Sequence, residues 1–124
     1  MSNKILGNYG ESLAQQYLQE RGYRILEKNF RNKLGEIDLI ALDGKTVCFV
    51  EVKTRHSVEQ GQPYEAINSW KIRKLSQMAT YYLKHKCHSL EILSRFDVIS
   101  IVYDKNNFPS PSIQHIKNAF DSTY

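Results

Sequence analysis

The chain has 124 residues, of which 41% are hydrophobic and 24% charged, the composition of an ordinary soluble globular domain. No apolar run is long enough to span a bilayer and the N-terminus lacks the features of a signal peptide, so we expect a single cytoplasmic domain over residues 1–124. Cys48 and Cys87 provide no disulfide framework, and the net charge of +4 suits a polyanion such as nucleic acid or simply a solvated surface.

The first predicted element is a helix over residues 7–23. Leu13, Ala14, Tyr17 and Leu18 form one apolar stripe at helical spacing, and Gly22 stands where a C-terminal cap belongs. Residues 23–30 then predict a short strand and residues 31–35 a turn. The N-terminal third therefore predicts one helix followed by the first strand of a sheet.

Two strands are predicted next, over residues 36–42 and 46–54, joined by a tight hairpin turn at Asp43-Gly44. A polar loop covers residues 55–66, and an amphipathic helix follows over residues 68–86. Residues 95–103 predict a strand, residues 104–112 a loop, and residues 113–120 a final short strand or tail. The order α-β-β-β-α-β-β predicts an α/β or α+β domain with a mixed central sheet flanked by helices.

The hairpin gives a definite expectation for three charged side chains. A two-residue turn at Asp43-Gly44 places Glu36 opposite Glu51 and Asp38 opposite Phe49. Because side chains alternate along a strand, Asp38, Glu51 and Lys53 then share one face with Glu36. We therefore expect two carboxylates and an ammonium within reach of one ligand.

Carboxylates held together in this way need a positive charge. At ~5 Å two of them repel by roughly 3 kcal/mol at an effective dielectric of 20. Their hard oxygen atoms suit Mg²⁺ or Mn²⁺, which can polarise a phosphoryl oxygen and activate a water, while Lys53 orients or deprotonates that water. The alternative is an Asp/Glu/Lys ion-pair cluster on an exposed strand face.

Basic residues surround this cluster. Between Lys53 and Lys86 the chain carries seven Lys or Arg residues against two Glu residues. We expect phosphate contacts from Arg31, Lys33 and Arg55 at strand ends, and from the basic helix that includes Lys74. Glu36 is expected to support Lys53 or Arg55 rather than to bind metal.

Other side chains give weaker signals. Trp70, Tyr81 and Tyr64 could stack on unpaired bases, although aromatic residues in such a segment more often pack inside. His85, Cys87 and His88 lack a fourth ligand at the spacing of a zinc site, and we expect no zinc there. No glycine-rich phosphate loop is present in the sequence.

Ile37-Asp38 and Glu51-Val52-Lys53 resemble the PD-(D/E)-x-K nuclease signature, with Ile37 where many of those enzymes have proline. Nearly the whole chain resembles the YraN-like family of small bacterial proteins. The segments that carry this resemblance are "GNYGESLAQQYL", "NFRNKLGEIDLIA", "GQPYEAINSWKIRKLSQMATYYL" and "RFDVISI". That family is similar to restriction-endonuclease-like enzymes and archaeal Holliday-junction resolvases, and its members are mostly described as uncharacterised, predicted nucleases. The resemblance implies a restriction-endonuclease-like three-layer core.

The resemblance also implies roles for particular residues. It implies metal ligands at Asp38, Glu51 and the backbone carbonyl of Val52, with Lys53 as the catalytic lysine. Glu11 is similar to an acid that related nucleases place on the first helix; the alternative is a surface residue that interacts with the helix dipole. Lys71 matches a lysine that opens the second helix, where it contacts the scissile phosphate or is solvated.

Together these patterns predict a Mg²⁺- or Mn²⁺-dependent, endonuclease-like protein that hydrolyses DNA, with branched and single-stranded DNA among its candidate substrates. Two alternatives stay open: a nucleic-acid-binding module without turnover, and a subunit that docks a protein partner on a nuclease fold. Junction cutting usually needs two active sites and hence a homodimer. The sequence leaves the substrate structure, the choice of DNA or RNA, and the oligomeric state undecided.

Overall fold

The computed structural model describes residues 3–56, 67–103 and 110–123. Its helices and strands follow the predicted order: α1 (Asn3–Glu20), β1 (Arg24–Asn32), β2 (Gly35–Asp43), β3 (Thr46–Arg55), α2 (Ser69–His85), β4 (Ser94–Val102) and β5 (Ser112–Phe120). The segment predicted as a strand or tail is thus the strand β5. The two predicted loops lie largely outside the described residues.

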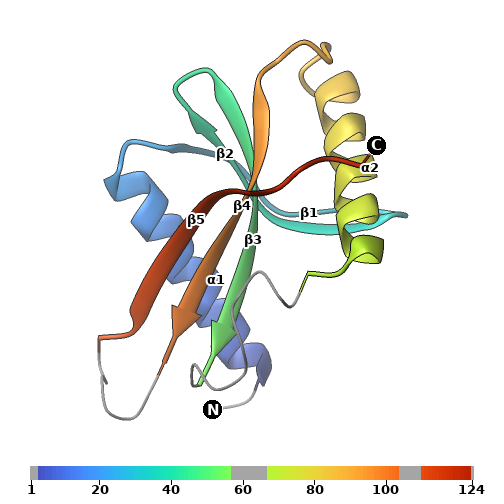
Figure 1. The fold of residues 1–124 in the computed structure, drawn as a ribbon. Helices are drawn as coiled ribbons and strands as arrows, with labels where there is room; N and C mark the ends of the chain where they lie inside the picture. The colour runs from blue at the N-terminus through green and yellow to red at the C-terminus, as the bar shows by residue number, and fades with distance from the viewer. Residues whose placement is uncertain (1–2, 57–66, 104–109, 124) are drawn as a thin grey trace.

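The strands form one mixed sheet between the two helices (Figure 1). Its order is β1-β2-β3-β4-β5, in which β3 and β4 are parallel and the other neighbours are antiparallel. A parallel pair needs a crossover connection, and α2 lies between β3 and β4 in the chain. The result is the predicted three-layer α/β core. No helix of the described ranges is long and apolar enough to cross a membrane.

Helix α1 covers one face of the sheet. Its buried residues Ala14 and Leu18 pack with Leu39 of β2 and Val50 of β3. Gly10 allows a close approach, because a Cβ atom at this position would collide with the side chain of Thr54 on β3. The chain leaves the helix through Gly22 at φ +87°, a left-handed conformation that glycine adopts without strain. The close contact between Gly10 and Thr54 holds α1 near β3, and Glu11 is the residue that follows Gly10 in this helix.

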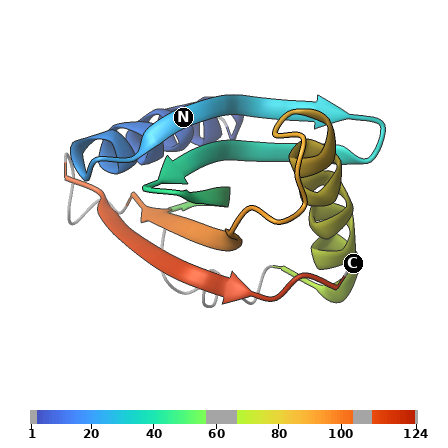
Figure 2. The same cartoon turned by 90° about the horizontal axis from the view of Figure 1, so that it is seen from above.

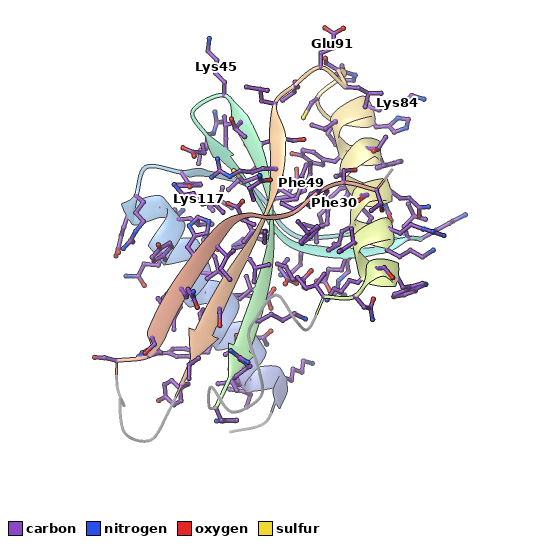
Figure 3. The ribbon with its side chains drawn as sticks, viewed as in Figure 1. Phe30, Lys45, Phe49, Lys84, Glu91 and Lys117 are labelled. Carbon is purple, nitrogen blue, oxygen red and sulfur yellow. The ribbon has the colours of Figure 1, made fainter. Side chains whose placement is uncertain are left out.

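Helix α2 covers the opposite face. It begins at an N-cap, where the side chain of Asn68 accepts a hydrogen bond from the backbone N–H of Lys71 at 2.9 Å. Leu75 and Met78 pack with Phe49, and Phe30 of β1 packs against the same cluster. Figure 3 shows Phe30 and Phe49 pointing into the space between sheet and helix. The apolar side of α2 thus packs on the sheet, and its polar residues lie along the edge of this contact.

The β2–β3 hairpin differs in register from the sequence prediction. Asp43 pairs with Thr46, so the turn residues are Gly44 and Lys45 rather than Asp43 and Gly44. Gly44 has φ +61°, which matches the first central position of a type II′ turn, where glycine is preferred. The predicted pairing was therefore wrong by two residues. A shift of two keeps every side chain on its face, so the predicted convergence is unaffected.

The pairing of β2 with β3 stops at Leu39 and Val50. Beyond this point residues 35–37 of β2 pair only with β1, and residues 51–55 of β3 pair only with β4. We call the point of separation the fork; Asp38 and Glu51 are the first residues beyond it on each strand. Seen from above, the β1–β2 turn lies beside α2 (Figure 2). The fork thus opens the sheet between the two helices.

Candidate metal centre at the fork

Asp38 occupies the fork itself. Its Oδ2 accepts a hydrogen bond of 2.8 Å from the backbone N–H of Val52, which replaces a strand partner at the point where the ladder ends. Burial raises the pKa of the Asp38 carboxyl to about 8, and the neighbouring Glu51 carboxylate contributes to the same shift. The surroundings of Asp38 therefore provide too little positive charge and too few hydrogen-bond donors to stabilise its carboxylate form.

Glu51 is more deeply buried, with only 7% of its surface exposed. Its Oε1 accepts a bond of 3.2 Å from the ammonium of Lys71. Its Oε2 is buried and has no hydrogen-bond partner among the described residues. Since a buried carboxylate oxygen without a partner is costly, this atom marks a place where a ligand would be stabilised.

Two lysines flank the acids and differ in character. Burial, together with the nearby Lys71 ammonium, lowers the pKa of Lys53. Burial is the largest single influence on Lys71 and disfavours its charge, but the Glu51 and Asp38 carboxylates and the hydrogen bond with Lys53 together outweigh it and raise the pKa of Lys71. Lys71 is partly exposed, and its ammonium is paired with Glu51. Lys53 is the amine that gives up its proton more readily.

Two further acids complete the cluster. Carboxylate oxygens of Glu11, Glu36 and Asp38 lie within 4.8 Å of one another. Burial and the Glu36 and Glu51 carboxylates raise the pKa of Glu11. Glu36 also forms an ion pair of 3.2 Å with Arg31, a partner that the sequence had not indicated. The structure thus brings Glu11 to the acids at the fork.

Asn29 is the residue of this cluster that the sequence analysis missed. Its backbone has φ 51°, a left-handed conformation that asparagine tolerates better than most residues. With its amide nitrogen turned toward the acids, it donates to Glu36 Oε1 at 2.8 Å and to Glu11 Oε1 at 2.7 Å. An asparagine inside a predicted strand is the only signal that the sequence offered.

The donors at the fork fit a divalent cation. Four carboxyl groups face two ammonium groups, all the acidic ligands are hard oxygen atoms, and one buried carboxylate oxygen lacks a partner. Val52, whose carbonyl was a predicted ligand, lines a cavity of about 260 Å³ together with Glu11, Asp38 and Lys53. The acids whose oxygens lie close enough together to share one cation are Glu11, Glu36 and Asp38, whereas the predicted ligand Glu51 lies outside this group.

A second cavity of about 430 Å³ opens from the fork toward α2. Its lining includes the acids Glu36, Asp38 and Glu51, and also Trp70, Lys71 and Lys74 of α2. Trp70 is 67% exposed, so the expectation that it packs inside is wrong. Tyr81, by contrast, packs beside Phe30 and His85, and Tyr64 lies outside the described residues.

The other predicted phosphate contacts are more dispersed. Lys33 is exposed in the β1–β2 turn, and Arg31 is exposed but engaged with Glu36. Arg55 ends β3 and is half-buried. Of the five predicted basic residues, Lys71 and Lys74 are those that line the cavity beside the acids.

The fold and the site define a mixed α/β protein consistent with a three-layer, nuclease-like core. Residues 10–101 match the model of a family described as "Uncharacterised protein family UPF0102". The chain belongs to this family, which confirms the resemblance to YraN-like proteins.

Relatives support the same assignment over the full chain. A UPF0102 protein of Geobacter metallireducens is 49% identical over 124 residues, covering 100% of this chain and 98% of the relative. A UPF0102 protein of Clostridium botulinum strain 657 is 46% identical over 118 residues, covering 95% of each. One of Caldanaerobacter subterraneus subsp. tengcongensis is 42% identical over 120 residues, covering 97% and 98%. The names of these relatives state no activity.

Proposed function

We propose that this protein is a Mg²⁺- or Mn²⁺-dependent phosphodiesterase that cleaves DNA. The observation that carries the proposal is the pair of carboxyl groups at the fork beside Lys53: half-buried Asp38 with a raised pKa, and buried Glu51 with an unpartnered oxygen. A structural ion-pair cluster would be expected to satisfy its buried oxygens, and this one leaves Oε2 of Glu51 without a partner among the described residues. Clefts that hold such perturbed groups are typical of functional sites.

The chemistry is a hydrolysis in which each residue has a distinct part. A divalent cation held by the acids at the fork would supply Lewis acidity and would neutralise charge on the phosphoryl oxygens. Lys53, in its neutral form, takes the proton of the attacking water as the new P–O bond forms. The bond from phosphorus to the leaving oxygen breaks, and that oxygen gains a proton from solvent. Lys71 stays charged and holds Glu51 in place.

The charge distribution favours a nucleic-acid substrate once a cation is bound. Without one, the acids at the fork repel a phosphodiester. Lys74 lines the cavity beside the acids, and Lys33 in the β1–β2 turn and Arg55 at the end of β3 would add the further positive charge that a phosphate backbone requires. The proposal assigns these three to backbone contacts, which fix the position of the strand but not its sequence.

The test is cleavage of linear, flapped and branched DNA with Mn²⁺. Wild type is compared with Asp38→Asn and Lys53→Met, which keep the approximate size of each side chain. We expect both variants to lose at least about 100-fold in rate, the usual scale for a lost general base or electrostatic group. Lys45→Met is the matched control, because Lys45 is exposed in the hairpin turn at the far end of both strands (Figure 3).

Equal rates in wild type, Asp38→Asn and Lys53→Met would contradict the proposal. Salt-dependent DNA binding that persists without metal, with no cleavage by any variant, would instead support the module without turnover.

A further inference from the structure

Trp70 is exposed in a way that needs an explanation. It is the only tryptophan of the chain, and 67% of its surface is exposed although it lies in the first turn of α2, next to Lys71. Large aromatic side chains left open to solvent beside charged residues are typical of binding surfaces. Its neighbour Lys74 places its ammonium 5.8 Å from the centre of the indole ring.

The cavity that Trp70 borders is lined by two chemically different groups of residues. We call it the Trp70 cavity; besides the acids, its lining includes Leu34, Trp70, Lys74, Leu75 and Met78. Leu75 and Met78 are buried and form an apolar floor, while Leu34 comes from the β1–β2 turn opposite α2. The apolar side chains and the indole ring can contact the face of a base, and the ammonium of Lys74 can contact the phosphate joined to it.

We propose that the Trp70 cavity is a subsite for one unpaired nucleotide of DNA, stacked on Trp70 with a phosphate near Lys74. This rests on the proposed function, because Asp38 and Glu51 line the same cavity. The strand would run from the stacked base to the phosphodiester at the fork. The substrate class is therefore DNA with an unpaired segment, such as a single strand or a flap.

Size and access favour an unpaired nucleotide over a base pair. A volume of about 430 Å³ lies in the lower part of the roughly 300–1,000 Å³ range of small-ligand pockets. A base inside a duplex has both faces covered by its neighbours, so only an unstacked base offers a face to an indole ring. The cavity thus discriminates by strand structure and not by base sequence.

The single tryptophan makes the subsite directly observable. The intrinsic fluorescence of Lys53→Met is measured in Mg²⁺, which allows binding with little turnover, during titration with a single-stranded oligonucleotide or a blunt duplex of the same length. We expect the single strand to quench the emission strongly and the duplex to quench it little. Equal quenching by both, or none by either, would overturn the subsite.

Variants on the same background then test whether the ring itself carries affinity. Anisotropy of a labelled single strand should show about ten-fold weaker binding after Trp70→Leu, the usual scale for losing one stacked base. Trp70→Phe should recover most of the affinity, and duplex binding should change less than about two-fold in either variant. Tyr81→Leu is the matched control, an exposed aromatic residue on the same helix that faces Phe30 and His85.

The outcomes separate the subsite from the proposed nuclease. If wild-type chain cleaves DNA and Trp70→Leu cleaves single strands equally well with unchanged affinity, the subsite is wrong and the phosphodiesterase stands. If quenching and affinity behave as expected but no substrate is cleaved with Mg²⁺ or Mn²⁺, the phosphodiesterase is wrong and the subsite stands.

Discussion

Two aspartates on the strands that flank β3 show what separates a structural carboxylate from one available to a ligand. Asp97 on β4 is fully buried, yet its oxygens accept bonds from Arg95 Nε at 3.0 Å, from the backbone N–H of Asn118 at 3.0 Å and from the Nε2–H of His115 at 2.8 Å. Asp38 on β2 accepts one bond, from Val52, and faces other carboxylates.

The two pKa values respond in opposite directions. Burial acts to raise both, but for Asp97 the bonds from His115, Asn118 and Arg95 outweigh it and lower the pKa. For Asp38 burial and Glu51 act together and raise the pKa to about 8. Burial therefore disfavours the charged form of both aspartates, and the two differ in the number of hydrogen-bond donors around the carboxylate. The donors around Asp97 balance its charge, whereas Asp38 has one donor and faces carboxylates.

The largest expected effect comes from breaking the complete network. Asp97→Asn removes the charge that holds Arg95 and His115, and leaves those groups buried with a poorer partner. We expect the free energy of unfolding at pH 7 to fall by about 3–5 kcal/mol. Urea unfolding followed by circular dichroism measures it, and a loss below about 1 kcal/mol would mean that the network is not structural.

The matched substitution at the fork should act in the opposite direction. Asp38→Asn removes a carboxyl group that resists ionisation where it lies, while its amide oxygen can still accept from Val52. In metal-free buffer at pH 8 we expect the free energy of unfolding to rise by about 1–3 kcal/mol, as is common when a functional site is relieved of like charges. Destabilisation of similar size would place Asp38 with the structural carboxylates.

The pH dependence of stability sharpens the same contrast. Asp38 has a folded pKa of about 8, above its unfolded value, so the native chain binds its proton more tightly. Its contribution to stability is complete below the unfolded pKa and is lost as the pH rises toward 8. Asp97 has a lowered folded pKa, so its contribution is present above the unfolded value and lost as the pH falls through the folded one. Asp38→Asn should flatten the decline from pH 5 to pH 8 in urea midpoints; an unchanged slope would contradict the raised pKa.

A smaller effect is expected from the lysine that pairs with Glu51. Lys71→Met leaves the carboxylate of Glu51 buried without a cation, although the lysine itself is partly exposed. We expect a loss of about 1–2 kcal/mol in metal-free buffer, less than for a fully buried pair. Because the vacated place suits a divalent ion, Mn²⁺ should restore more stability to Lys71→Met than to wild type. Thermal unfolding with and without Mn²⁺ tests this, and no added gain would count against a cation beside Glu51.

The sequence predicted the convergence of Asp38, Glu51 and Lys53 because strand alternation is insensitive to a register error of two residues. It missed the register itself, since Gly44 rather than Asp43 takes the first turn position. It also missed Asn29, whose role depends on a backbone conformation that no local pattern announces.

Two other features depend on contacts distant in the chain. The surroundings of Asp97 join β4 to β5 through His115 and Asn118, and sequence spacing did not indicate that pairing. Trp70 is exposed and lines a cavity together with Leu34 of the β1–β2 turn and Gly35 at the start of β2. The local sequence pattern does not indicate this arrangement and favoured packing.

Calorimetric titration with Mn²⁺ at pH 7, in two buffers of different ionisation enthalpy, tests most directly whether the fork is a cation site. We predict one ion bound per chain with release of close to one proton, because Asp38 with a pKa of about 8 is largely protonated at this pH. Asp38→Asn should abolish both signals, while Asp43→Asn, on the same strand and paired with Arg95, should leave them unchanged. Equal binding by wild type and Asp38→Asn, or no binding by wild type, would contradict the cation site.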